Sequence, residues 1–360
     1  MPFLLVSFFL LVVFFITTNL VIFYIKRNAE NKPQKAEKSP VSILIAMKNE
    51  SVNIQSLINS LRNLDYPADK FETILVDDNS DDNTFETCKK AIEDLPDFKL
   101  IKAEKKKMPG KKGALTVGLE HCAYENIALT DADCTPQKKW LSAVSAALSK
   151  FDVAFGASPL LPEKSFISRF ASYESGKNQI FNFAALVFGI PVSATGRNFA
   201  YKKSSFAKTG GYEKTLETLS GDDDLFLREA YKKKLKVGFI NGRDAAVISR
   251  APKNSKEYFS QRARHVKTSH HYSAPQKIFT AVYFLGDFLS TYAFILSGLN
   301  VAFLLPSILK FKIAFTNRKK FGDFFGKNFS FSETFIFELV HPAFAAINFA
   351  LSVFTKEKWD

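Results

Sequence analysis

The hydrophobic pattern of this 360-residue chain changes along its length. Residues 3–25 carry no charged side chain. At about 1.5 Å per residue, a helix of that length crosses a hydrocarbon core of about 30 Å. A cleaved signal peptide is the rival interpretation, but no basic segment precedes the apolar run and no small-x-small cleavage site precedes Lys26. The pattern therefore predicts an N-terminal transmembrane anchor over residues 1–27.

Basic residues follow the predicted anchor directly and continue into a linker over residues 28–40. They are Lys26, Arg27, Lys32, Lys35 and Lys38. Cytoplasmic flanks of membrane helices are enriched in Lys and Arg. We therefore expect an integral protein of the inner, cytoplasmic membrane, with everything downstream of the anchor in the cytoplasm.

A second apolar region follows Lys277, over residues 278–309, with Asp287 as its only charged residue. It is too long for one untilted helix, so we expect a hairpin broken near residues 297–300. Residues 339–354 form another apolar stretch, short enough to be interfacial or re-entrant. The sequence thus predicts a C-terminal membrane region over residues 271–360 and leaves the topology of residues 330–360 open.

Residues 41–270, between these apolar regions, have the pattern of a soluble α/β domain. Apolar residues recur at helical spacing between Ile54 and Leu64. Segments that predict strands lie at residues 41–46, 71–76, 98–103 and 126–131. Strands that alternate with helices indicate a parallel sheet covered on both faces, and such sheets bind ligands at the carboxyl ends of their strands.

Acidic residues occupy those strand ends. Asp77 and Asp78 end one predicted strand, where a carboxylate can accept hydrogen bonds from a base or a ribose. Asp131 and Asp133 lie one residue apart after another strand, in a spacing suited to bridging a divalent cation and a diphosphate. Such oxygen ligands favour Mg2+ or Mn2+. Chance and turn formation also produce D-x-D sequences, but the position at a strand end favours a metal site.

Lysines crowd the stretch that leads into the sequence GKKGAL, where a helix is expected to start. They are Lys99, Lys102, Lys105, Lys106, Lys107, Lys111 and Lys112. For most of them, the simpler interpretation is a solvated basic loop or a surface that faces anionic lipid. Lys111 and Lys112 are the candidates for phosphate contact.

Composition limits the partners. The chain has 49 Lys and Arg against 36 Asp and Glu, a net charge of +13, which suits an anionic partner or an anionic membrane surface. We expect no nucleic-acid partner, because no helix-turn-helix, aromatic RNP or zinc-finger pattern accompanies the basic residues. Three cysteines without metal-type spacing indicate neither a disulfide framework nor a zinc site, and a reducing compartment fits best.

The ordered segments of residues 41–270 resemble glycosyltransferase family 2, whose members use a nucleotide-binding fold of the GT-A type. VSILIAMKNE resembles the opening strand of the family and its turn at Asn49 and Glu50. ILVDDNSDD resembles the acidic turn that contacts the nucleotide, which implies binding roles for Asp77 and Asp78. GKKGAL and LTDADC resemble the phosphate-side lysine, here Lys112, and the metal-binding D-x-D, here Asp131 and Asp133. Asp131 is also expected to contact the nucleotide sugar.

Three later segments extend the resemblance. GRNFAYKKSSFAKTGGY, over residues 196–212, resembles the acceptor-side segment. SGDDDLFLR resembles the motif that supplies the catalytic base, and counting back from Arg228 aligns Asp222 with that base, while Asp223 serves if the register slips by one residue. QRARH resembles the QxxRW motif of membrane-bound members. It implies catalytic roles for two residues, which are Gln261 and Arg264.

The chain departs from the family pattern at two points. The usual Glu-Asp base motif reads Gly-Asp-Asp-Asp here, so inspection alone does not fix the base, and Asp222 ranks above Asp223. His265 replaces the tryptophan of the QxxRW motif. This removes a large stacking surface and makes processive polymer synthesis less expected.

The resemblance implies an α/β fold: a GT-A, Rossmann-like nucleotide-sugar-binding domain flanked by transmembrane helices. It implies an inverting hexosyltransferase-like enzyme that uses Mg2+ or Mn2+ and a nucleotide-diphosphate sugar, with a UDP-sugar favoured. The acceptor would be a glycan or a lipid at the cytoplasmic membrane face, in the synthesis of a cell-surface polysaccharide or glycolipid. Two alternatives remain at this stage: a polyprenyl-phosphate sugar transferase, and a non-catalytic membrane-tethered protein that binds nucleotide sugar or anionic lipid.

Overall fold

The computed structural model describes residues 38–325 and 328–355. The predicted anchor at residues 1–27 and most of the basic linker lie outside the described residues. Within them the chain forms two compact units. The sheet unit comprises residues 38–161 and 193–250, and the helical unit comprises residues 162–192 and 251–355. Each unit is described by itself below, and the predicted domain boundary at residue 270 stays a prediction.

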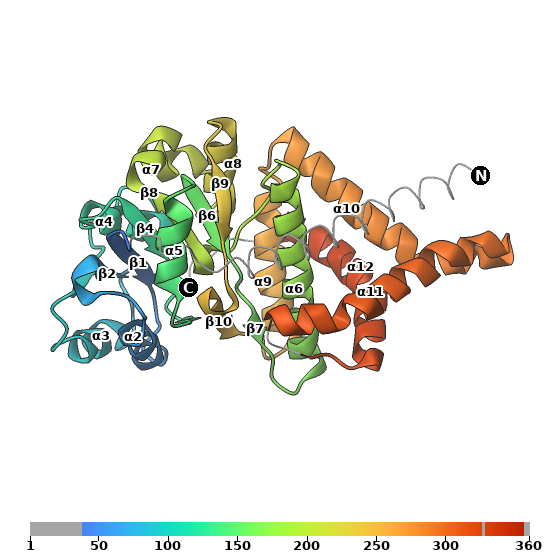
Figure 1. Cartoon of the computed structure of the whole chain (residues 1–360), viewed down its shortest axis with the longest axis horizontal. Coiled ribbons are helices and arrows are strands. Elements are labelled where there is room, and N and C mark those ends of the chain that lie inside the picture. Colours follow the sequence, from blue (N-terminus) through green and yellow to red (C-terminus); the bar gives the residue numbers. More distant parts are fainter. Residues whose placement is uncertain (1–37, 326–327, 356–360) are drawn as a thin grey trace. The chain divides into compact units, whose positions relative to one another are not determined.

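The sheet unit is built on a seven-stranded sheet with the strand order β3-β2-β1-β4-β8-β6-β9 (Figure 1). In chain order the strands are β1 (Val41–Met47), β2 (Phe71–Asp77), β3 (Phe98–Lys102), β4 (Asn126–Leu129), β6 (Val153–Gly156), β8 (Phe199–Lys202) and β9 (Val237–Ile240). Strands β3, β2, β1 and β4 are parallel to one another. Strand β8 runs antiparallel to both β4 and β6, and β6 pairs parallel with β9. A smaller sheet has the order β5 (Thr135–Pro136), β10 (Val247–Arg250), β7 (Leu160–Leu161).

Helices cover the large sheet. Those of the sheet unit are α2 (Ile54–Arg62), α3 (Thr84–Ala91), α4 (Gly110–Glu120), α5 (Trp140–Leu148), α7 (Lys203–Thr209) and α8 (Asp224–Lys232). Its short 3-10 helices are η1 (Ala68–Lys70), η2 (Gly196–Asn198), η3 (Gly211–Thr215) and η4 (Arg243–Ala245). Gly118 lets α4 approach the sheet closely, because a Cβ there would lie 2.4 Å from a Leu44 methyl group and 2.6 Å from one of Val76.

The predicted strands and the predicted α2 helix are confirmed. Every residue of β1 is buried, as expected for a central parallel strand covered on both faces. Leu57, Ile58 and Leu61 of α2 are fully buried in the same core as β1. The apolar residues at helical spacing therefore form the buried face of this helix. The antiparallel strand β8 was not predicted, since its short apolar segment has no neighbouring pattern that reveals strand direction.

The helical unit contains α6 (Phe166–Val187), α9 (Ser255–Ser269), α10 (Ala274–Tyr292), η5 (Ala293–Gly298), η6 (Val301–Phe303), α11 (Leu304–Phe325) and α12 (Phe331–Phe354). Helix α12 packs against α6, α9, α10 and α11 (Figure 1). Among the described residues, two helical stretches are long and apolar enough to cross a membrane: Ala274–Gly298 and Phe331–Phe354. The first stretch ends near residues 297–300, where the sequence predicted a break. The second stretch begins at Phe331, eight residues before the apolar segment that the sequence showed at residues 339–354.

Candidate active site

The two loops that follow β1 and β2 are tied to each other. Asn49 has a positive φ of 56°, a left-handed conformation that Asn tolerates. Its N–H donates to Ser80 Oγ at 3.0 Å, and its Oδ1 accepts from the N–H of Asp81 at 2.9 Å. Glu50 donates its N–H to Thr84 Oγ1 at 2.7 Å. These bonds fix the backbone at the carboxyl edge of the sheet.

Asp77 and Asp78 at the end of β2 are both buried. Asp77 Oδ1 accepts a hydrogen bond from Ser80 Oγ at 2.5 Å, which holds the loop. Asp78 forms an ion pair with Lys106, one of the crowded lysines. The sequence prediction that these two carboxylates contact the nucleotide stays a prediction, and in this structure their carboxylates have protein partners.

The D-x-D pair lies in the loop after β4. One ligand atom each of Asp131, Asp133 and Cys134 lies within 4.8 Å of the others. Burial and the nearby carboxylates raise the pKa of the Cys134 thiol well above its usual value, so this sulfur stays protonated and is a poor ligand. Loss of hydration and the charge of Asp131 raise the pKa of Asp133, although Arg197 opposes the shift. Two carboxylates that repel each other and offer hard oxygen ligands fit Mg2+ or Mn2+.

Glu50 belongs to the same acidic neighbourhood. Burial first, and then the charges of Asp133, Asp131 and Asp82, raise its pKa to about 7, while a hydrogen bond from Asn53 acts in the opposite direction. The side chain therefore responds to the charge on the D-x-D pair. The turn after β1 and the loop after β4 therefore lie close together.

Lys111 connects the D-x-D loop to the acidic motif before α8. Its Nζ lies 2.7 Å from Asp131 Oδ1 and 2.8 Å from Asp222 Oδ2. Burial disfavours the charge on Lys111, but the two carboxylates outweigh that effect and raise its pKa. Burial likewise opposes ionisation of Asp222, yet the charge and hydrogen bond of Lys111 lower its pKa. Two carboxylates that are 91 residues apart in the sequence thus share one ammonium group.

Lys112 has protein partners in this structure. Its ammonium is buried and donates hydrogen bonds to the carbonyl oxygens of Thr215 and Thr218, the latter at 3.0 Å. These contacts fix the segment between η3 and α8. Of these two lysines, Lys111 is the one that pairs with Asp131 and Asp222. A contact between Lys112 and the nucleotide sugar stays a prediction.

The three consecutive aspartates at the start of α8 have different partners. Asp223 caps the helix and uses both oxygens on backbone amides: Oδ1 accepts from the N–H of Asp224 at 2.7 Å and Oδ2 from that of Gly196 at 2.6 Å. Burial, followed by the charges of Asp224 and Asp222, raises the pKa of Asp223 well above its usual value. Asp224 Oδ1 accepts from Ser193 Oγ at 2.7 Å. Asp222 is the one whose carboxylate is paired with Lys111.

A comparison with known families assigns this domain. The family model described as Glycosyl transferase family 2 matches residues 42–210, which include the D-x-D pair and Lys111. Those residues are a family 2 glycosyltransferase domain. The acidic motif at residues 220–228 lies beyond the matched segment.

Relatives of the family 2 domain agree with this assignment. The probable glycosyltransferase YdaM of Bacillus subtilis is 27% identical over a 260-position alignment that covers 66% of this chain and 57% of the relative. The β-monoglucosyldiacylglycerol synthase of Trichormus variabilis is 38% identical over 93 residues, 26% of this chain and 20% of that protein. The chain therefore spans little more than half the length of the first of these relatives.

A solved structure has the same fold as this chain. The mannosyltransferase PcManGT from Pyrobaculum calidifontis, in complex with GDP-Man and Mn2+, superposes with a TM-score of 0.53 at 20% sequence identity. The superposition covers 95% of this chain and 99% of that one. The predicted GT-A fold is thus confirmed.

Two residues of the family 2 domain that sequence reasoning did not single out lie in this site. A Cβ at Gly196 would stand 3.2 Å from Asp223 Oδ2, 3.3 Å from Asp222 Oδ2 and 3.5 Å from Lys111 Nζ. The positive charge of Arg197 acts on Asp133. Both residues belong to the acceptor-side segment at residues 196–212. No spacing rule connects that segment to the D-x-D pair.

The segment that carries these residues is fixed from the core. Trp140 is fully buried and its Nε1–H donates to Asn198 Oδ1 at 3.0 Å. Asn198 Nδ2 donates in turn to the carbonyl oxygens of Ala157 at 2.9 Å and Ala245 at 3.2 Å. This network holds η2 in place and thereby sets the position of Gly196 beside the aspartates.

Gln261 and Arg264 lie outside the family 2 domain, on α9 of the helical unit. The QRARH sequence is helical in the structure, so residues three apart share a face. Arg262, between them, forms an ion pair with Glu174 at 3.1 Å within the helical unit. The catalytic roles of Gln261 and Arg264 stay predictions.

Proposed function

We propose that this chain is an inverting, metal-dependent glycosyltransferase. It would take a sugar from a nucleotide-diphosphate sugar, with a UDP-sugar favoured, and transfer it to a glycan or lipid acceptor at the cytoplasmic membrane face. The observation that carries the proposal is the position of Lys111 between Asp131 and Asp222. This shared ammonium group supports a common site for the candidate metal loop and the candidate base.

The candidate cation ligands are Asp131 and Asp133. A bound Mg2+ or Mn2+ would stabilise the negative charge that develops on the departing nucleoside diphosphate. Lys111 and Arg197 add fixed positive charge around these carboxylates, which supports binding of an anionic donor. Burial and the nearby carboxylates raise the pKa of Glu50 to about 7, and a bound cation would favour its ionised form.

The candidate base is Asp222, and two observations favour it over Asp223. Lys111 lowers the pKa of Asp222, so its carboxylate is ionised and able to accept the proton of an acceptor hydroxyl. Asp223 instead uses both oxygens to hold backbone N–H groups and has a raised pKa. In the proposed reaction, the hydroxyl oxygen attacks the anomeric carbon as its proton passes to Asp222. The bond to the diphosphate oxygen breaks on the opposite side, which inverts the configuration.

The acceptor side of the proposal draws on the helical unit. Two of its helical stretches are long and apolar enough to cross a membrane, and the chain has a net charge of +13. Positive charge close to a bilayer favours anionic lipid surfaces. The relative from Trichormus variabilis is named for a glycolipid product, which supports a lipid acceptor among the two classes.

A panel of nucleotide sugars tests the proposal. The full chain, purified in detergent, is incubated with UDP- and GDP-sugars and with Mn2+, Mg2+ or a chelator, and release of nucleoside diphosphate is measured with and without membrane lipid extract. We expect release from one donor that requires a divalent cation and increases with extract. If as much nucleoside diphosphate is released with the chelator as with metal, the metal role is contradicted. If no donor releases nucleoside diphosphate, the transfer reaction itself is contradicted. A polyprenyl phosphate added alone distinguishes the polyprenyl-phosphate transferase.

A further inference from the structure

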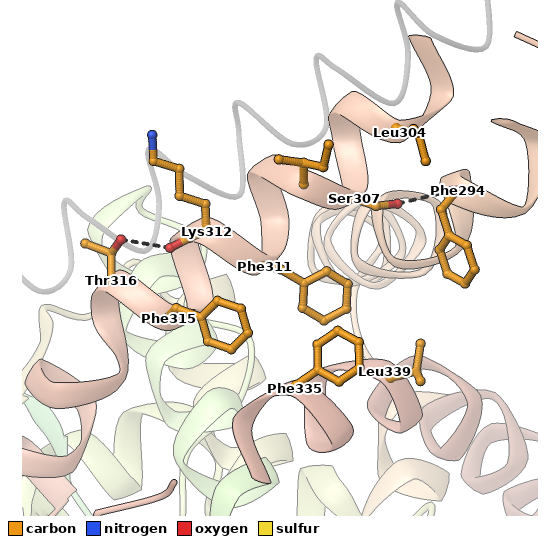
Figure 2. Close-up of a pocket in the computed structure, with 10 residues that line it drawn as sticks. Phe294, Leu304, Ser307, Phe311, Lys312, Phe315, Thr316, Phe335 and Leu339 are labelled. Atoms are coloured by element: carbon orange, nitrogen blue, oxygen red, sulfur yellow. Dashed lines mark hydrogen bonds between the residues drawn. The ribbon is translucent and has the colours of Figure 1, made fainter. Parts of the chain in front are cut away.

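The helical unit contains an apolar groove whose lining includes none of the residues assigned to the proposed reaction. It has a volume of about 650 Å³, within the range of about 300–1,000 Å³ that small-molecule sites occupy. Figure 2 shows aromatic and aliphatic side chains that face one another across it. The residues that matter most are Phe294, Ile308, Phe311, Phe315, Phe335 and Leu339, from η5, α11 and α12.

The walls of the groove are held by contacts behind them. Lys310 of α11 is buried and its Nζ lies 2.8 Å from Asp287 of α10 and 3.3 Å from Glu338 of α12. Ser307 Oγ donates to the carbonyl oxygen of Ser290 at 2.9 Å. Charged groups inside an apolar helical unit persist only when they are paired, so these contacts fix α11 against both partner helices. The groove is therefore preformed.

The surroundings of the groove are those of a lipid-facing surface. The two stretches that are apolar enough to span a membrane, Ala274–Gly298 and Phe331–Phe354, supply Phe294, Phe335 and Leu339 of its lining. Ile308 is 58% exposed and Phe335 is 43% exposed. Apolar side chains exposed to this extent on such helices are suited to contact with acyl chains.

One cation borders the groove. Lys312 is exposed, and its ammonium points away from the aromatic rings (Figure 2). Among residues 38–325 and 328–355, no carboxylate forms an ion pair with it. An apolar groove with an unpaired cation beside it complements an amphiphile that has a hydrocarbon tail and an anionic head.

We propose that the groove binds one acyl chain of an anionic glycerophospholipid from the bilayer, with the phosphate at Lys312. The apolar segment at residues 3–25 is a less suitable occupant, because it has no acidic residue to match Lys312. A second copy of the chain is the other rival occupant. Lipid binding at this site can be tested without any measurement of activity.

Native mass spectrometry of the full chain in detergent provides the first test. Phosphatidylglycerol and phosphatidylcholine with identical acyl chains are added, and the bound lipid is counted. We expect one retained phosphatidylglycerol per chain and weaker retention of phosphatidylcholine. In K312Q, this preference should disappear while the fold is unaffected, since Lys312 is exposed. No retained lipid in the wild type, or an unchanged preference in K312Q, overturns the proposal.

A second variant fills the groove. In L339W the indole should occupy the space of the tail and lower phosphatidylglycerol occupancy at least about tenfold, equivalent to lost burial of about two methylene groups. I347W is the matched control, because Ile347 lies on the same helix and is 44% exposed but does not line the groove. Equal occupancy in L339W and I347W contradicts the proposal.

A photoreactive side chain identifies the occupant directly. Replacing Phe335 by p-benzoylphenylalanine places the reactive group in the groove lining, and irradiation in phosphatidylglycerol vesicles should give a lipid adduct. Cross-links to a peptide from residues 3–25, or a covalent dimer, would show that one of the rival occupants fills the groove.

Discussion

Replacing Lys111 by Met removes the ammonium group that Asp131 and Asp222 share. The aliphatic part of the side chain is preserved, so the change acts mainly on charge. The side chains of Lys111 and Asp222 are 12% and 11% exposed, and that of Asp131 is 31% exposed. Water can therefore replace the lost contact at Asp131 only in part and at Asp222 hardly at all.

The size of the effect follows from these distances. Each carboxylate lies within 2.8 Å of the ammonium, so without it the two carboxylates face each other at roughly 5 Å. At an effective dielectric constant of about 20, such like charges repel by about 3 kcal/mol. Removing one partner of a buried ion pair typically costs about 3–5 kcal/mol. Because Asp131 keeps some exposure, we expect the lower end, a loss of about 3 kcal/mol in the free energy of unfolding.

Urea unfolding, followed by the fluorescence of Trp140, measures this loss in the sheet unit. Trp140 is fully buried there, and a Trp359→Phe background removes the other tryptophan signal. The matched control is Lys139→Met, whose ion pair with Asp244 at 3.2 Å is 62% and 66% exposed. Exposed pairs contribute about 0–1 kcal/mol. The loss in Lys111→Met should also shrink toward acid pH, since Lys111 lowers the pKa of Asp222 and the stability from that ionisation disappears as pH falls.

Equal stability of Lys111→Met and Lys139→Met would refute this reasoning. It would mean that the ammonium of Lys111 does not hold the two carboxylates together in solution. A loss that grows as pH falls would refute the sign of the electrostatic argument.

Three further predictions concern neighbouring residues. The pKa of Glu50 is raised from 4.5 to about 7, so the folded state favours the protonated carboxyl group. The stability gained from this protonation is complete below pH 4.5 and is lost as pH rises through about 7. Without divalent cations the melting temperature of the wild type should fall across that window more than that of Glu50→Gln, and parallel curves would contradict this. Gly196→Ala places a Cβ 3.3 Å from Asp222 Oδ2 and should lower turnover by about tenfold or more; Gly298→Ala, where no atom lies within 4 Å, is the control and should be unchanged. Lys112→Leu leaves buried carbonyl oxygens without their donor and should cost about 1–3 kcal/mol in urea unfolding, whereas an unchanged midpoint would contradict the structural role of Lys112.

The part of the site that the sequence could predict depends on strand ends. Runs such as VSILIAM and FETILVD are apolar for most of their length because both faces of the sheet are covered, and the acidic residues that end the pattern must therefore lie at its carboxyl edge. On this basis Asp77, Asp78, Asp131 and Asp133 were expected at one edge of the sheet, whereas Glu50 entered only through the family resemblance.

The sequence could not decide between the two lysines at the start of α4. The helix begins at Gly110, so Lys111 and Lys112 both lie in its first turn and differ in direction by about 100°. No apolar stripe precedes them to show which direction faces the sheet. Lys112 is buried under η3, a contact with residues about 100 positions away that no local pattern reports.

Gly196 and Arg197 were missed for a related reason. They lie on a short 3-10 turn whose place is fixed by the hydrogen bond between Trp140 and Asn198. That bond joins an α5 side chain to a residue 58 positions later. Periodicity describes only neighbours along the chain, so it cannot predict such a link.

The central claim is that Asp133 and Asp222 belong to one site but act differently. Calorimetric binding of UDP in the presence of Mn2+, together with nucleotide release under transfer conditions, measures both roles in the wild type, Asp133→Asn and Asp222→Asn. We predict that Asp133→Asn loses Mn2+-dependent UDP binding and that Asp222→Asn keeps this binding but loses transfer. Full UDP binding by Asp133→Asn, or full transfer by Asp222→Asn, would contradict the claim.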